Sequence, residues 1–236
     1  MARNRAIIPA VLADAAHRVA GSNVPVEIVT VPLGEPGGLP WTERLLPLVV
    51  LMAVFFGGLM IPASSLINEK QKRTLEALNV TPATLGDVFA AKGFIGAVLA
   101  VIMGVLSLAV SGALSGQFWA QLLVLALGAI MAVEIGLVSG AVVKDMNTLF
   151  TLWKLGGLLL FGPAIVYMFP NIPEWIGYLF PTFYVIKPMV DMSVSGRSFA
   201  GELLYLVVLV GLVVLGFLLV ANVVRRLSRQ ALRLNG

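Results

Sequence analysis

The chain has 236 residues, of which 59% are hydrophobic and 12% charged, and its mean hydropathy is +0.97. A soluble domain carries about 25% charged residues, so this composition indicates an integral membrane protein. The chain has no Cys, which excludes disulfides and thiolate metal sites. The net charge is +4, but the basic residues flank hydrophobic runs. We therefore expect the lipid bilayer as a partner, and no nucleic acid.

Residues 1–40 are the only sizeable soluble stretch and predict a short α/β extramembrane piece. Residues 10–20 favour a helix, and the valine-rich residues 24–33 favour an edge strand, because prolines interrupt that stretch. Residues 34–40 are rich in Gly and Pro and predict a linker.

Residues 41–236 contain five apolar runs long enough to cross about 30 Å of hydrocarbon as helices. A crossing segment must satisfy its own backbone hydrogen bonds, and these runs do not alternate as barrel strands do. The predicted fold is therefore an all-α integral membrane protein. Its predicted spans are residues 45–67, 93–115, 118–143, 148–169 and 203–224.

Residues 68–92 form the only strongly charged segment between apolar runs. Glu69 with Arg73, and Lys72 with Glu76, are spaced four apart and favour a short amphipathic helix. The charges alone fit a solvated loop equally well.

Two helix-start signals follow in the same segment. Thr81-Pro82 offers an N-cap and then a proline at the first helical position, and Thr84 with Asp87 offers a second cap. One helix is therefore predicted to end in this segment and another to begin.

Residues 170–200 are interrupted by prolines too often to form a full span. Residues 175–184 are nevertheless apolar and aromatic, which favours short helices that re-enter the outer leaflet. An interfacial loop with anchoring aromatic residues is the alternative.

The distribution of basic residues predicts the orientation. Only Arg44, Lys187 and Arg197 lie near spans on the predicted outer side, so the C-terminus is expected in the cytoplasm and residues 1–40 outside. The chain is predicted to be a multi-pass protein of the cell membrane. The basic residues on the predicted inner side are Lys70, Lys72, Arg73, Lys92, Lys144, Arg225, Arg226, Arg229 and Arg233.

Glu134 and Lys154 are the two charged residues within spans rather than at their ends. A charge at this depth costs about 2.5–3.5 kcal/mol on insertion scales. Both lie at comparable distances from the turn at residues 144–147, so we expect them to pair or to line a polar path. Lys154 could equally extend to the membrane interface.

Small residues recur every four positions beside and within two spans, at Ser107, Ser111 and Ser115, at Gly112 and Gly116, and at Gly136 and Gly140. This spacing lets helices approach closely. Packing within one subunit is the first interpretation, and a dimer interface is the second.

The charged segment resembles the membrane subunits of type-2 ABC exporters. It has a Glu at the end of a span, a Thr-Leu-Glu, a Thr-Pro, and Lys92 opening the next span; the family's Gly before the Thr is Arg73 here. The resemblance implies a coupling helix that binds an ATPase subunit. The residues implied in ATPase coupling are Glu69, Lys72, Arg73, Thr74, Leu75, Glu76, Thr81 and Pro82.

A second stretch resembles the same family, at Pro173, Trp175, Pro181 and Tyr184. The resemblance implies that these residues form a re-entrant gate at the outer end of the path. Members of the family have six spans, with an outer segment after the first. By resemblance this chain is either a truncated or split permease, or a permease whose N-terminal segment is exported by the spans that follow.

The resemblance implies a permease subunit of an ATP-driven exporter, working with a second permease copy or a homologous permease. The chain has no G-x-x-x-x-G-K-[ST] phosphate loop. We therefore expect no enzyme activity and no bound cofactor or metal, with ATP and Mg held by separate ABC ATPase subunits.

Two questions stay open at this point. The few charges in the spans favour a hydrophobic drug or a lipid-like cargo. The alternative function is a non-transporting membrane scaffold or assembly protein that docks a cytosolic partner through residues 68–92.

Overall fold

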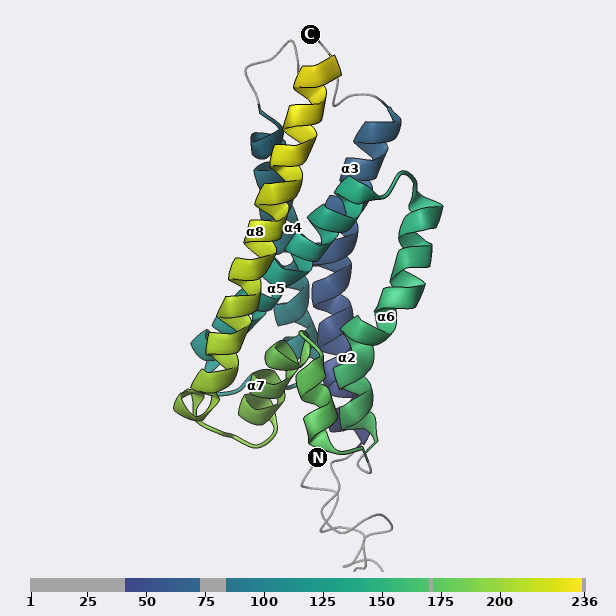
Figure 1. Cartoon of the computed structure of the whole chain (residues 1–236). Coiled ribbons are helices and arrows are strands. Elements are labelled where there is room, and N and C mark those ends of the chain that lie inside the picture. Colours follow the sequence, from purple (N-terminus) through teal and green to yellow (C-terminus); the bar gives the residue numbers. More distant parts are fainter. Residues whose placement is uncertain (1–40, 73–83, 170–171, 235–236) are drawn as a thin grey trace, which may run out of the picture. The chain divides into compact units, whose positions relative to one another are not determined.

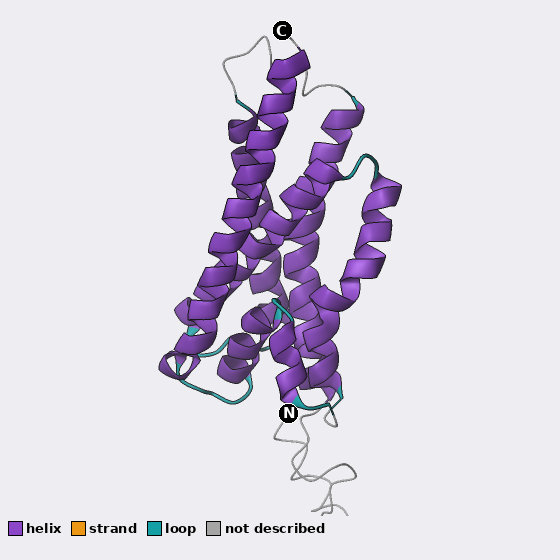
Figure 2. Cartoon of the chain, viewed as in Figure 1, coloured by secondary structure: helices purple, strands orange, loops and turns teal. Residues whose placement is uncertain are grey.

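The computed structural model describes residues 41–72, 84–169 and 172–234. The chain divides into two units, Met1–Leu39 and Pro40–Gly236, and all described residues belong to the second. The α/β piece predicted at residues 1–40 lies outside the described residues. Every regular element in the described ranges is a helix, with no strand among them (Figure 2).

Five segments are long and apolar enough to cross a membrane, which confirms the predicted number of spans. The first is continuous from α2 (Trp41–Phe55) through the π-helix η1 (Phe56–Met60) to α3 (Ile61–Gln71). The other elements are α4 (Leu85–Val110), α5 (Phe118–Val142), α6 (Met146–Met168), the 3₁₀-helix η3 (Glu174–Leu179), α7 (Phe183–Ser193), the 3₁₀-helix η4 (Phe199–Glu202) and α8 (Leu203–Leu234).

Helix α5 is the centre of the bundle and contacts α2, η1, α3, α4, α7 and α8 (Figure 1). In the most apolar 18-residue stretch of α5, 61% of the stretch is buried inside the bundle. The corresponding share is 22% for α4 and 11% for the span that contains α8. The outer helices therefore present apolar side chains to their surroundings, as helices that face lipid do.

Glycines bring α5 against the first span. A Cβ on Gly136 would lie 2.6 Å from the Leu59 carbonyl oxygen, and one on Gly140 would lie 2.7 Å from the Cα of Ala63. These two small residues therefore pack within the chain, as the first interpretation predicted.

The predicted serine stripe is cut short at the end of α4. The helix ends at Val110, five residues before the predicted end, and Ser111 is its C-cap. Gly112 then has a φ of +65°, a conformation that favours glycine and turns the chain out of the helix. Ser115 consequently does not share a helical face with Ser107.

Side-chain caps fix the starts of α4 and α6. The Thr84 Oγ1 accepts the Asp87 N–H at 3.2 Å, and Asp87 Oδ2 accepts the Thr84 N–H at 2.8 Å, which confirms the second predicted cap. Helix α4 therefore begins eight residues before the predicted span. Asp145 caps α6 in a similar way, and the hydrogen bonds from the backbone N–H and hydroxyl of Thr148 lower the pKa of its carboxyl.

Candidate functional site

The end of α3 and the start of α4 are joined by a half-buried lysine. Lys92 Nζ lies 2.6 Å from Glu69 Oε1 and 2.5 Å from Ser65 Oγ. Its side chain is only 12% exposed. This contact connects the two helices on either side of residues 73–83.

Lys70 ties the same end of α3 to α5. Its ammonium donates to the Ala141 carbonyl oxygen at 2.9 Å and to the Val143 carbonyl oxygen. These carbonyls lie at the C-terminal end of α5, where the helix has no intrahelical donors left and its dipole favours a positive charge. Lys70 therefore acts as a side-chain cap for the central helix.

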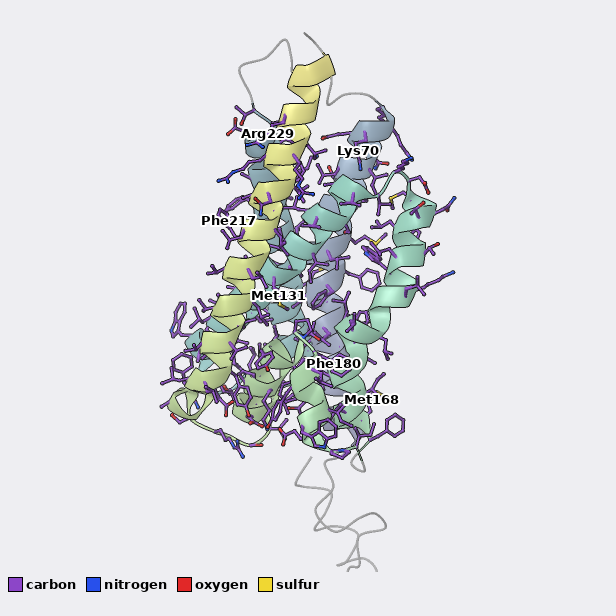
Figure 3. All side chains as sticks on the ribbon, viewed as in Figure 1. Lys70, Met131, Met168, Phe180, Phe217 and Arg229 are labelled. Atoms are coloured by element: carbon purple, nitrogen blue, oxygen red, sulfur yellow. The ribbon has the colours of Figure 1, made fainter. Side chains whose placement is uncertain are left out.

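The basic residues gather at this end of the bundle. Figure 3 places Lys70 and Arg229 there, with Met168 and Phe180 toward the opposite end. Lys92 near the start of α4, Lys144 in the turn after α5, and Arg225 near the end of α8 belong to the same end. The predicted coupling residues Arg73, Thr74, Leu75, Glu76, Thr81 and Pro82 lie outside the described residues.

Glu134 occupies the middle of the bundle. The residue is 6% exposed, and its Oε2 has no hydrogen-bond partner. Met131, one turn earlier on α5, is labelled in Figure 3 and lies well inside the bundle. Glu134 is therefore a deeply placed carboxylate without a counter-charge among the described side chains.

Two apolar cavities meet at Glu134. One, of about 520 Å³, lies between α5, α6 and α8. The other, of about 640 Å³, lies between α4, α5 and α8. Both volumes fall in the range of drug-sized binding pockets, about 300–1,000 Å³.

The predicted ion pair between Glu134 and Lys154 is not formed. Lys154 is exposed on α6 and has no salt bridge within the described ranges. Glu134 instead faces Gly216 of α8, since a Cβ at that glycine would lie 2.1 Å from its Oε2. Helix α6 packs mainly on α2 rather than on α5.

The opposite end of the bundle holds an ionic network around Asp191. Lys187 Nζ lies 3.1 Å from Asp191 Oδ2 and 2.6 Å from Glu174 Oε1, and Arg197 Nη1 lies 3.2 Å from Asp191 Oδ2. Glu202 is 1% exposed and faces Arg197 at 3.9 Å through Oε1, while its Oε2 has no hydrogen-bond partner. The network joins η3, α7 and η4.

The pKa of Lys187 is raised above its ordinary value. Burial by itself would lower it, but the hydrogen bonds to Glu174 and Asp191 outweigh that effect. Because the pKa of Lys187 is raised in the folded state, its protonated form stabilises the fold, and this stabilisation is complete below the ordinary lysine pKa. It is lost only as the pH rises through the raised value.

Sequence reasoning did not predict this network. Lys187 and Arg197 were noted only as outer charges, and the acidic partners were missed. Lys187 and Asp191 are four residues apart, so a helical pairing signal was present, but Pro188 between them indicated an interrupted segment. Glu174 and Glu202 come from separate elements, which no local pattern reveals.

The four predicted gate residues occupy different environments. Pro173 is the N-cap of η3, and Trp175 is 62% exposed. Pro181 borders the cavity of about 520 Å³. Tyr184 donates to the Tyr178 carbonyl oxygen at 3.1 Å and packs edge-on against the fully buried Phe183. The re-entrant geometry of this segment stays a prediction.

The spanning helices define a multi-pass membrane protein. Residues 38–223 match the family model described as fluoroquinolones export permease protein Rv2686c-like, and the chain belongs to this family. The membership confirms the resemblance to type-2 ABC exporter permeases, and the family description is that of an export permease. No curated protein matches the chain, and no solved structure does.

Proposed function

We propose that the chain is the membrane-spanning permease subunit of an ATP-driven exporter of amphipathic drugs of the fluoroquinolone class. Two permease copies, or one with a homologous partner, form the translocation path, and separate ABC ATPase subunits bind ATP and Mg. The observation that carries this proposal is the family match over residues 38–223, which covers four crossing helices in full and most of the fifth.

The basic end of the bundle faces the cytoplasm in this proposal. It gathers lysines and arginines from near the ends of α3, α4, α5 and α8. The other end has Arg44 in the first turn of α2, and Lys187 and Arg197, which are neutralised by acidic neighbours. The positive-inside rule supports this orientation. The C-terminus is then cytoplasmic and residues 1–40 lie outside.

Residues 68–92 receive the motion of the ATPase in this proposal. The Glu69–Lys92 contact joins α3 to α4, and Lys70 joins α3 to the C-terminal end of the central helix α5. A displacement of residues 73–83 is therefore passed to three spans at once. Contact networks with discrete arrangements can carry such coupling.

The two cavities supply space for the cargo. Their walls are almost entirely apolar, and aromatic side chains line both, namely Trp153 in one and Phe89, Phe94 and Phe217 in the other. Planar aromatic drugs fit such walls because ring contacts add to the burial of apolar surface.

The test is ATP-dependent uptake of a fluoroquinolone into inverted membrane vesicles that contain the chain and its cognate ATPase. Lys92→Met removes the link between α3 and α4, and we expect uptake to fall about tenfold, within the usual range of coupling free energies of about 1–3 kcal/mol. Lys144→Met is the matched control, because this lysine is exposed at the same end of the bundle.

Two outcomes would contradict the proposal. If the chain co-purifies with an ATPase but its vesicles show no ATP-dependent uptake, the result would favour the scaffold function. Equal uptake by Lys92→Met and Lys144→Met would exclude the Glu69–Lys92 contact from the coupling route.

A further inference from the structure

Glu134 is an ionisable residue that the fold buries without a salt bridge and without a hydrogen bond to its Oε2 among the described residues. It lies eight residues before the end of α5, about 12 Å along the helix, and so cannot be regarded as an end residue. It is 6% exposed, and its Oε2 accepts no hydrogen bond. Ionisable groups at such depth are costly and mark binding sites or transport paths more often than packing positions.

Helix α8 makes room for this carboxylate. A Cβ at Gly216 would lie 2.1 Å from Glu134 Oε2 and 2.8 Å from its carboxyl carbon. Gly211, five residues earlier on the same helix, has nothing within 4 Å of a Cβ. The absence of a side chain at 216 is therefore what lets α8 lie over the carboxylate.

Glu134 is the one residue that lines both cavities, which lie on either side of the contact between α5 and α8. The only other charged residue in either lining is Arg225, nine residues after Gly216 and therefore about 13 Å away along α8. No salt bridge joins Arg225 to Glu134 among the described side chains. The carboxylate thus borders two apolar cavities whose one cation in the described linings, Arg225, forms no ion pair with it.

An ionised carboxylate in such a chamber needs a positive partner, since a buried charge without one is strongly unfavourable. We propose that Glu134 is the cation-binding residue of the cargo site. The ammonium group of an amphipathic cation pairs with its carboxylate, while the apolar body of that molecule occupies one of the two adjoining cavities. That the ligand is exported cargo rests on the proposed function, whereas binding at Glu134 does not.

This site selects by charge as well as by shape. A molecule with the same aromatic body but no basic amine leaves the carboxylate unpaired, and an anion is repelled by it. Fluoroquinolones with a basic piperazine ring have both required parts. The wild-type chain is therefore expected to prefer them over counterparts whose piperazine nitrogen is acetylated.

The first experiment measures binding of tetraphenylphosphonium, an apolar cation, to the purified full-length chain in lipid nanodiscs. Glu134→Gln keeps the shape of the side chain and removes the charge, and we expect binding at least about tenfold weaker. Glu134→Asp retains the charge and is expected to keep part of the affinity. Gly211→Ala, at the open position on α8, is the control and is expected to bind like the wild type.

A second experiment compares a piperazinyl fluoroquinolone with its N-acetyl counterpart in binding and in ATP-dependent vesicle uptake. We expect Glu134→Gln to lose the preference for the basic compound and to bind the acetylated one at least as well as the wild type does, because the carboxylate of that compound is no longer repelled. Equal binding of tetraphenylphosphonium by the wild type and Glu134→Gln would overturn the site, as would a wild type that does not bind it. Charge-selective binding without any ATP-dependent uptake would instead overturn the export function and leave the site standing.

Discussion

Two buried carboxylates in the bundle have nearly the same exposure and opposite surroundings. Asp191 is 5% exposed and accepts contacts from Lys187 and Arg197. Glu134 is 6% exposed, and its Oε2 has no partner. The difference shows that depth alone does not define a functional charge, because a paired carboxylate can hold helices together while an unpaired one is available to a ligand.

The two regions therefore differ in what a neutral replacement does. Removing one member of a buried ion pair leaves the other charge uncompensated and costs stability. Removing a charge that has no partner leaves nothing uncompensated. Substitutions in the two regions test this contrast, and their expected effects on stability decrease in the order that follows.

Lys187→Met is expected to cause the largest loss of stability, about 3 kcal/mol, because Asp191 keeps its charge in a buried position and the remaining cation, Arg197, is 59% exposed and screened by solvent. Thermal unfolding of the purified chain in detergent, followed by intrinsic fluorescence, measures the loss. The double variant Lys187→Met/Asp191→Leu removes both charges and is expected to recover most of it. A double variant as unstable as the single one would show that the network does not act through charge pairing.

Gly216→Ala is expected to have the next largest effect, about 1 kcal/mol, the low end of overpacking, because the new methyl group displaces the Glu134 carboxylate at the end of its side chain. Gly211→Ala on the same helix has open space and is expected to leave unfolding unchanged. Thermal unfolding of both variants provides the measurement. Identical melting curves would contradict the close approach of α8 to Glu134.

The spans were predictable from the sequence because the membrane imposes a length and an apolar composition on every crossing helix. The boundaries were less predictable. Asp87 and Lys92 lower the hydropathy at the start of α4, so the predicted span began at residue 93, although the capping box and the contact with Glu69 let the helix begin at Leu85.

The sites were less predictable than the spans, for a geometric reason. Counting residues from the turn at 144–147 gave Glu134 and Lys154 similar depths, but it could not show that α6 packs on α2 and that Glu134 faces α8. The network at Asp191 likewise needs residues from three elements. Only the pair Lys187 and Asp191, four residues apart, could have been found locally.

Arg197→Gln sharpens the contrast within the paired region itself. Its side chain is 59% exposed, so solvent screens its contact with Asp191, and we expect a loss of no more than about 1 kcal/mol. A denaturation series in detergent at low and high salt provides the measurement, since a screened pair weakens further as salt is added. A loss as large as that of Lys187→Met would contradict the dominant role of the buried lysine.

Glu134→Gln is expected to have the smallest effect on stability, with a change near zero or a slight gain. The substitution removes a buried charge that no described side chain compensates, and no partner is left exposed. The new amide is itself a buried polar group, and its cost offsets most of the gain. Thermal unfolding without ligand measures this effect. Adding tetraphenylphosphonium is then expected to raise the melting temperature of the wild type and leave that of the variant nearly unchanged, because a ligand stabilises only the state it binds. A large loss of stability in the ligand-free variant would place Glu134 with Asp191, as a carboxylate that holds the fold together.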